Sequence, residues 1–444
     1  MHDPRPAPPA PPPLTPVRVF WFYLPLAAMW LTMGVEQPVI TAFIGRLPDE
    51  ELNLAAFGVA FTMGLLIEAP VIMLLTAGTA LADSRANYAR LLRFTHILAA
   101  SLTALHALVG FTPLHRVVIG WFVGAQEELI TPVRDAFVLM TPWTASIAYR
   151  RLWQGVLIRF RRTVVVPIAM IARLVAVCGV LILGFGTGVP GAVLGALSLS
   201  CGVIASAAAT YAFCAPVLKR MPGSSTSEPI AWKELLHFYA PLALTSLLTL
   251  GRRPILTMGM ARSLQALASL AVWPVVTSVL FIIGSLAIAS QEVVVALRDE
   301  ERSFDALQRF TRGLSLCLVG MLALFAFTPL ARLWFAHVAD LDAQLVALAG
   351  APMMLLCVVP GLDTMLAWNR GLLVHERRTS TISWAVALNL AVLLGTLFGL
   401  IAVTELTGAT VAAVSLAAAL GLEAVFLWWR RTRAARRPPP ARHE

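Results

Sequence analysis

Charged side chains occur inside stretches that are long and apolar enough to cross a membrane. The run 238–262 places Arg252 and Arg253 side by side, about fourteen residues from its start. An arginine near the centre of a bilayer costs about 3 kcal/mol, so such a residue faces a bundle interior or a water-filled cavity. Pro254 follows directly and removes one helical hydrogen bond, which predicts a kink or a local opening of the backbone. Because guanidinium groups suit carboxylates and phosphates, the pair predicts an anion site.

The sequence contains this stretch twice. Residues 22–46 align with residues 238–262 without a gap when 216 is added to each number, and the register persists along the chain until one inserted residue makes it 217 near the end. The repeat pairs three sets of polar positions inside apolar segments. They are Glu36 with Arg252, Gln37 with Arg253, and Arg173 with Asn389.

Membrane proteins built from such repeats usually place their ligand site where the repeats meet. We therefore expect the six paired residues to line a shared cavity and to bind a substrate. The alternative for Glu36 is an ion pair with Arg252 that holds the two repeats together and touches no ligand. Since adjacent helical residues point about 100° apart, we expect one arginine to pair with Glu36 and the other to be left for an anion.

Two further carboxyl groups are candidates for coupling transport to an ion. Glu68 lies beside Pro70 near the middle of the second apolar segment, and Asp363 follows Pro360 and Gly361 in the tenth. Desolvation favours the protonated form of such a group, which is what a proton-coupled carrier needs. The alternative for both is a structural residue that is protonated or paired with an arginine. Arg150 and Arg151 are interpreted as residues at the cytoplasmic end of a helix whose long side chains extend to the membrane surface.

Composition places the chain among polytopic helical membrane proteins. Hydrophobic residues make up 58% and charged residues 13% of 444 residues, and the mean hydropathy is +0.78, which a soluble domain of this length could not bury. The net charge of +10 comes from arginines in short loops, so a nucleic-acid partner is not needed to explain it. The five cysteines are scattered singly, and no enzyme motif is present, so we expect no metal, no cofactor and no enzymatic activity.

The apolar segments fall into six and six, which predicts an all-α protein of twelve transmembrane helices in two six-helix bundles. Because each half has an even number of spans, the repeat is parallel, and the bundles should meet at spans one, two, seven and eight. Arginine-rich loops all alternate onto one side, which predicts an inner-membrane protein with both termini in the cytoplasm. The predicted domains are a disordered proline-rich tail (1–17), an N-terminal lobe (18–218), a linker (219–234), a C-terminal lobe (235–431) and a basic tail (432–444).

Several short motifs carry a resemblance to a known family. They are Glu36-Gln37 in the first span, the PLAL run followed by Arg253-Pro254-Ile255 in the seventh, and Trp368 with Gly371-Leu372-Leu373 at the end of the tenth. With two lobes of six helices, the chain resembles the multidrug/oligosaccharidyl-lipid/polysaccharide (MOP) flippase superfamily, which includes the MATE antiporters. More narrowly, it resembles bacterial relatives of the progressive ankylosis protein. That resemblance implies a V-shaped, alternating-access exporter of anions such as pyrophosphate, citrate or nucleotides.

The leading hypothesis is therefore a monomeric secondary transporter in the lipid bilayer that exports a small, anionic or phosphorylated solute, coupled to a proton or a sodium ion. A lipid-linked saccharide flippase and a cationic multidrug antiporter of the same fold are the alternatives, and a non-transporting membrane scaffold is the third. The arginines of the seventh span favour an anion over a cationic drug.

Overall fold

The computed structural model describes residues 14–160, 162, 164–223, 229–298, 303–375 and 379–435. Most of the predicted proline-rich tail, the centre of the predicted linker and most of the basic C-terminal tail lie outside these residues. The first half of the chain forms ten helical elements. They are α1 (Pro16–Ile44), α2 (Glu50–Ile72), α3 (Leu74–Leu81), α4 (Arg85–Phe111), α5 (Leu114–Arg116), the π-helical η1 (Val117–Val123), α6 (Glu127–Leu139), α7 (Thr141–Arg159), α8 (Val165–Gly184) and α9 (Gly191–Lys219).

The second half follows a similar order, but its first span is broken into two helices and its second span is a single helix. Its elements are α10 (Trp232–Leu250), α11 (Arg252–Ala261), α12 (Ala266–Leu297), α13 (Ser303–Phe327), α14 (Pro329–Leu333), the π-helical η2 (Trp334–Val338), α15 (Ala343–Leu355), the 3₁₀ turn η3 (Leu356–Val358), α16 (Val359–His375), α17 (Thr379–Val403) and α18 (Gly408–Ala435). Among the residues with assigned structure there is no β-strand, only an isolated bridge between Leu264 and Thr407. The predicted all-α fold is confirmed.

Nine helical spans within the described ranges are long and apolar enough to cross a membrane. Three further segments, α1, α6 with α7, and α10 with α11, lie where the sequence predicts the remaining spans. The charged residues in α7 and α11, together with the polar start of α6, lower the apolar character of two of these segments. The structure therefore supports a multi-pass helical protein, and the count of twelve stays a prediction.

The predicted break in the seventh span is present. α10 ends at Leu250 and α11 begins at Arg252, so the helix is interrupted at Gly251, three residues before Pro254. Proline cannot donate a backbone hydrogen bond to the preceding turn, which is the physical reason for an interruption here. The break places both arginines at the start of a new helix.

The backbone itself carries the internal repeat. Two non-glycine residues start helices from the left-handed region, Asp49 with a φ of 54° and Gln265 with a φ of 52°, and they are 216 positions apart. Gly124 after η1 and Asp340 after η2 also have positive φ and the same separation. Left-handed backbone is uncommon for residues other than glycine, so its recurrence at this offset indicates that the two halves share their turns as well as their helices.

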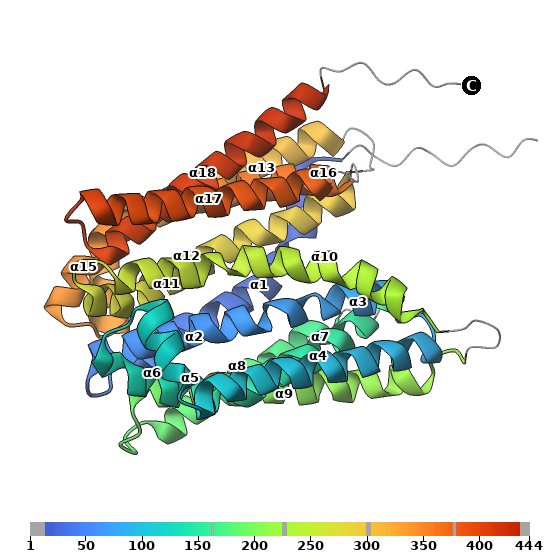
Figure 1. Ribbon diagram of the computed structural model, residues 1–444. Helices are drawn as coiled ribbons and strands as arrows, with labels where there is room; N and C mark the ends of the chain where they lie inside the picture. The colour runs from blue at the N-terminus through green and yellow to red at the C-terminus, as the bar shows by residue number, and fades with distance from the viewer. Residues whose placement is uncertain are drawn as a thin grey trace, which may run out of the picture.

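The two halves form two lobes that meet along a few helices. In Figure 1, α2 to α9 lie in the lower part of the molecule and α12 to α18 in the upper part. α1 packs along α12, and α2 packs against α10, α11 and α12. The prediction that the lobes meet at the first, second, seventh and eighth spans is confirmed.

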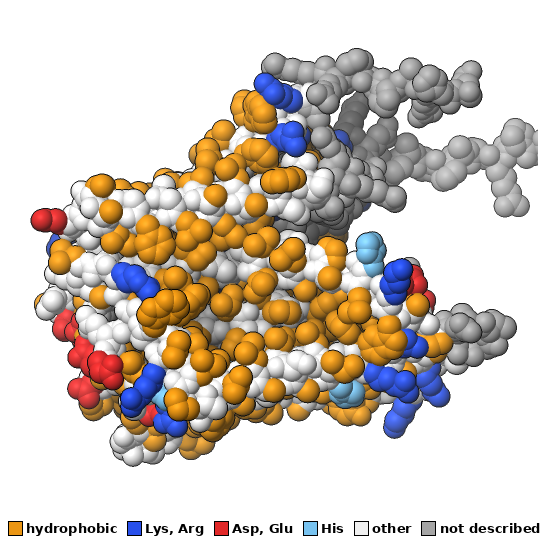
Figure 2. All heavy atoms as spheres, viewed as in Figure 1, with side chains coloured by type: hydrophobic (Ala, Val, Ile, Leu, Met, Phe, Trp, Pro, Cys, Tyr) orange, Lys and Arg blue, Asp and Glu red, His pale blue; other side chains and the backbone are white. Residues whose placement is uncertain are grey.

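The two ends of the molecule differ in charge. α1 begins and α18 ends at the same end, which we call the terminal end, and the opposite end is called the distal end (Figure 1). On the face shown in Figure 2, most acidic side chains gather at the distal end, a group of Lys and Arg side chains lies at the terminal end, and hydrophobic side chains cover the region between. This is the distribution expected of a protein that crosses a bilayer.

Two glycines let α3 and α7 cross with their backbones in contact. A Cβ on Gly155 would collide with the carbonyl oxygen of Leu75 and would lie 2.9 Å from the Cα of Gly78. We expect Gly155→Ala to lower the free energy of unfolding by about 1–3 kcal/mol, because two backbones must separate. Thermal unfolding in detergent measures this. Gly179→Ala in α8 is the matched control, since a Cβ there meets nothing within 4 Å, and it should not lower stability. Equal melting of Gly155→Ala and the unmodified protein would contradict the close crossing.

Candidate functional site

The two adjacent arginines of α11 point into different lobes. Arg252 is half-buried, its Nε donates a hydrogen bond to the carbonyl oxygen of Thr249 at 3.2 Å, and the charges that act on it most belong to Arg370, Glu423 and Asp363 of the C-terminal lobe. Arg253 instead faces the N-terminal lobe. Its guanidinium carbon lies 5.8 Å from the centre of the Phe61 ring on α2. The divergence expected from helical geometry is therefore present.

Among the described residues, the guanidinium of Arg253 has fewer polar partners than that of Arg252. Its side chain is exposed although the helix that carries it lies between the lobes. Within the described ranges, no carboxylate oxygen lies within 4.0 Å of its guanidinium nitrogens. A cation held against an aromatic ring and open on its other side can accept an anionic ligand.

Glu36 pairs with a different arginine from the one predicted. Arg173 on α8 binds it through two bonds, from Nε to Oε1 at 2.9 Å and from a terminal nitrogen to Oε2 at 2.7 Å. Both residues are buried. The predicted pairing of Glu36 with an arginine of the seventh span is therefore wrong. α1 packs on α8 within its own lobe, so Arg173 reaches the carboxylate first.

Glu68 is a buried carboxyl group under the influence of several arginines. It is 5% exposed, its Oε2 has no hydrogen-bond partner among the described residues, and the positive charges that act on it, in order of effect, are Arg151, Arg150, Arg173 and Arg253. Arg150 is only 2% exposed and donates to the sulfur of Met170 at 3.3 Å. The interpretation of Arg150 as a residue reaching out of the membrane is wrong, because α7 continues to Arg159 and leaves Arg150 in its interior.

A second charged cluster occupies the C-terminal lobe. Arg370 of α16 is paired with Glu423 of α18, and both act electrostatically on Asp363. Asp363 also lies next to Gly284, since a Cβ on that glycine would be 3.7 Å from the Oδ2 atom. Gly284 is the repeat mate of Glu68. The two lobes thus place a carboxylate in related positions but supply it from different helices.

Sequence reasoning missed Arg370. The apolar pattern predicts that the tenth span ends at residue 369, whereas α16 continues to His375. The available signal was the repeat, because Arg370 falls on Gln154, a residue that is 2% exposed inside α7.

The remaining predicted site residues are not brought to the arginine pair by a direct bond. Asn389 on α17 is 1% exposed, and neither its Oδ1 nor its Nδ2 has a partner within the part of the chain that the structure describes. Gln37 is half-buried on α1 beside Glu36. Glu36 is therefore bonded to Arg173, whereas Arg252 with Asp363 and Arg253 with Glu68 are linked through electrostatic effects alone.

The chain matches a protein-family model over more than half of its length. The model of the progressive ankylosis protein (ANKH) matches residues 13–307. The chain belongs to the progressive ankylosis protein family. No curated protein matches it significantly, so the sequence evidence for membership is the family model.

Solved structures share the fold of this ankylosis-family chain. An inward-facing multidrug resistance MATE family transporter of the MOP superfamily is 16% identical, with a TM-score of 0.69 over 92% of this chain and 98% of the other. The lipid II flippase MurJ, inward closed, is 11% identical, with a TM-score of 0.72 over 93% and 87%. A MOP superfamily transporter from Pyrococcus furiosus is 15% identical, with a TM-score of 0.64 over 95% and 96%. These structures confirm the predicted MATE-like helical fold, and the family model confirms the predicted resemblance to the progressive ankylosis protein.

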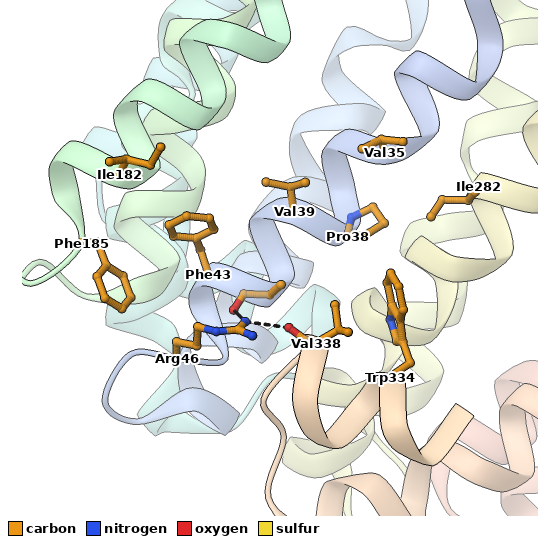
Figure 3. A pocket seen from close by; sticks show the side chains of 11 residues that line it. Val35, Pro38, Val39, Phe43, Arg46, Ile182, Phe185, Ile282, Trp334 and Val338 are labelled. Carbon is orange, nitrogen blue, oxygen red and sulfur yellow. Dashed lines mark hydrogen bonds between the residues drawn. The ribbon is translucent and has the colours of Figure 1, made fainter. Parts of the chain in front are cut away.

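The family member also has a hollow that lies apart from the charged clusters. It has a volume of about 650 Å³ and lies between the lobes near the distal end (Figure 3). Apolar side chains line it from α1, α8, α12 and η2, among them Val39, Phe43, Phe185 and Trp334, while Arg46 is the one charged residue of its lining. A groove of this composition suits hydrocarbon and gives an anion little to bind.

Proposed function

We propose that the protein is an alternating-access exporter of a small anionic organic solute, and that Arg253 makes the principal contact with the anion. The observation that carries this proposal is an exposed guanidinium, between the lobes, without a carboxylate in ion-pair range among the described residues. The arginine Arg173 already has its carboxylate, and so does Arg370. Arg253 is thus available to a ligand in a way that these two are not.

The charge around Arg253 supports the same conclusion. Two glutamates, Glu36 and Glu68, interact electrostatically with four arginines, so positive charge is in excess. The arginines are Arg150, Arg151, Arg173 and Arg253. An excess of positive charge in a region of low dielectric attracts anions and repels cations. The resemblance to the ankylosis proteins implies substrates with carboxylate or phosphate groups, which a guanidinium can bind through two parallel hydrogen bonds.

The alternatives differ in what Arg253 would bind. A flippase for a pyrophosphate-linked lipid would also use an arginine, and MurJ, which has the same fold, is a lipid II flippase. A cationic drug would avoid it. The Pyrococcus furiosus transporter is described as having a binding pocket of reverse polarity that suggests a different function, so pocket charge varies among proteins of this fold.

The orientation is part of the proposal. The group of Lys and Arg side chains at the terminal end supports termini in the cytoplasm of a cell whose inner membrane holds the protein (Figure 2). In that orientation the anion enters from the terminal end and leaves at the distal end. We propose a monomer as the working unit, because each chain supplies both lobes.

We expect Arg253→Gln to reduce anion affinity and flux by about 10- to 100-fold, because one hydrogen bond to a charged group contributes about 1.5–3 kcal/mol. Flux is measured in proteoliposomes loaded with pyrophosphate, citrate or ATP, and affinity by calorimetry with the same anions. Arg116→Gln is the control, an exposed arginine of α5 that is remote in sequence from the clusters.

Three results would count against this proposal. One is equal anion binding by Arg253→Gln and the unmodified protein. Another is transport of the cation ethidium and of none of the anions. The third is a polyprenyl-linked pyrophosphate that co-purifies with the protein and is detected by mass spectrometry of its lipid extract, which would favour the flippase.

A further inference from the structure

Two arginines at the distal end cross from one lobe to the other. Arg46, after α1, donates from one terminal nitrogen to the carbonyl oxygen of Val338 at 2.6 Å (Figure 3). Its other terminal nitrogen donates to the carbonyl oxygen of His337 at 2.9 Å, and both acceptors lie at the end of η2. Arg262, after α11, donates to the carbonyl oxygens of Trp121 at 2.7 Å and Phe122 at 2.9 Å at the end of η1. Arg46 and Arg262 are 216 positions apart. Each lobe therefore reaches into the other through the same residue of the repeat.

The π-helical ends explain why arginine is used. The last carbonyl groups of a helix have no intrahelical partner and carry partial negative charge. Several of them point the same way, so a planar guanidinium can bond to more than one at once. Gly124 also keeps room for this contact at η1, because a Cβ there would lie 2.6 Å from the guanidinium carbon of Arg262.

Two tyrosines make an equivalent pair of contacts nearer the terminal end. The Tyr23 hydroxyl on α1 donates to the carbonyl oxygen of Leu286 on α12 at 2.9 Å. The Tyr239 hydroxyl on α10 donates to the carbonyl oxygen of Pro70 on α2 at 2.5 Å. Donors and acceptors are again 216 positions apart, and each bond joins one lobe to the other.

The rings of these tyrosines are also held by the opposite lobe. Tyr23 packs edge-on against Phe310 of α13 with ring centres 5.2 Å apart, and Tyr239 packs edge-on against Phe94 of α4 at 4.7 Å. Phe310 and Phe94 are repeat mates as well. The start of α1 thus packs against the C-terminal lobe, and α10 packs against the N-terminal lobe.

The two sets lie far apart along the first and the seventh spans. Tyr23 and Arg46 are separated by 23 positions, which is about 34 Å of helix. A rigid rocking of the lobes that opens the distal end must break the arginine contacts and can keep the tyrosine contacts. The opposite rocking reverses these roles, so each set is a barrier to one of the two open states.

We propose that Arg46 with Arg262 forms the distal gate of the transport cycle and Tyr23 with Tyr239 the terminal gate. This proposal rests on the alternating-access function, and it assigns these four side chains a positioning role without contact with substrate. Because each gate has two copies, loss of one copy weakens it and loss of both opens it. In this structure the contacts of both gates are formed.

The test measures distances between the lobes by pulsed electron spin resonance, in the full chain with its five cysteines replaced by alanine. One reporter pair uses spin labels at Thr187 and Glu405, in exposed loops between α8 and α9 and between α17 and α18. The other pair uses Arg159 at the end of α7 and Ser380 at the start of α17, both exposed. No substrate is added, so the outcome is independent of whether the solute is an anion.

We expect Arg46→Gln with Arg262→Gln to increase the population with a long distal distance at least fivefold and to leave the terminal distance unchanged. Tyr23→Phe with Tyr239→Phe should do the opposite. Arg116→Gln and Tyr211→Phe, which remove the same groups away from these contacts, should change neither distance. If the variant with both glutamines does not fold, Arg46→Lys with Arg262→Lys is used instead. It keeps the positive charges but loses the planar guanidinium that bonds to several carbonyl groups, and it should give a smaller shift in the same direction. Unchanged distances in the folded double variants, or both double variants opening the same end, would overturn the proposal.

Discussion

Replacing Arg173 by methionine is expected to lower the free energy of unfolding by about 3–5 kcal/mol, because it leaves a buried carboxylate without its cation. Glu36 and Arg173 are joined by two bonds of 2.9 and 2.7 Å and are buried together between α1 and α8. Glu36→Leu should be similarly costly, since it leaves the guanidinium unpaired. Melting temperatures in detergent, combined with chemical unfolding, measure the loss.

A double variant tests whether the two residues stabilise the protein as a pair. Glu36→Leu with Arg173→Met removes both charges and should recover most of the stability, because two apolar groups of similar size need no partner. The exposed pair of Arg134 and Asp135, 3.2 Å apart, is the control, and Asp135→Asn should cost less than about 1 kcal/mol. If the double variant is as unstable as the sum of the single variants, the two residues do not act as a pair.

Replacing Asp363 by asparagine is expected to abolish the response of flux to a pH gradient. Asp363 lies with Glu423 among two arginines, Arg252 and Arg370, so this cluster has equal numbers of positive and negative groups. When Asp363 takes up a proton, the cluster as a whole carries one positive charge in excess. This excess changes how strongly Arg252 attracts an anion. Asparagine imitates the protonated carboxyl permanently. The measurement is anion flux into proteoliposomes with and without an imposed pH gradient.

Glu68→Gln is the companion variant in the other lobe. The charges of Arg151 and Arg150 act most strongly on its carboxyl group, so its loss leaves these cations unbalanced and should also lower stability. Its flux is therefore compared at a temperature where both variants remain folded. If the flux of both variants still depends on the pH gradient, the two carboxyl groups are not the coupling sites. If flux depends on a sodium gradient instead, sodium is the coupling ion.

The internal repeat made the fold predictable, because a single offset gives both the order of the helices in the second lobe and the depth of each residue in the membrane. Adding 216 to a position in the first lobe locates its mate in the second at a related height, and the left-handed turns at Asp49 and Gln265 obey the same rule. Proline at position 254 predicted the break at Gly251. The turns and the break depend on residues close in sequence, and the repeat is itself a pattern in the sequence, so all of these features can be recognised without the structure.

The pairing inside the site could not be predicted in the same way. Depth placed Glu36 level with Arg252, but which side chains meet depends on how each helix is rotated and which neighbour it packs against. α1 packs on α8, and Arg173 takes the carboxylate. The same limit applies to Arg150, because in a sequence an arginine buried inside a helix looks the same as one that marks the end of a membrane span.

Gly284 and Glu68 occupy equivalent positions of the repeat but differ in chemistry. Position 284 carries no acid, and the Asp363 carboxylate from α16 lies 3.7 Å from where a side chain on Gly284 would start. A negative charge thus stands near the same place in both lobes, although a different helix supplies it. Homologues are therefore expected to carry an acid at one of these two positions and a small or neutral residue at the other, as a compensated exchange between α12 and α16.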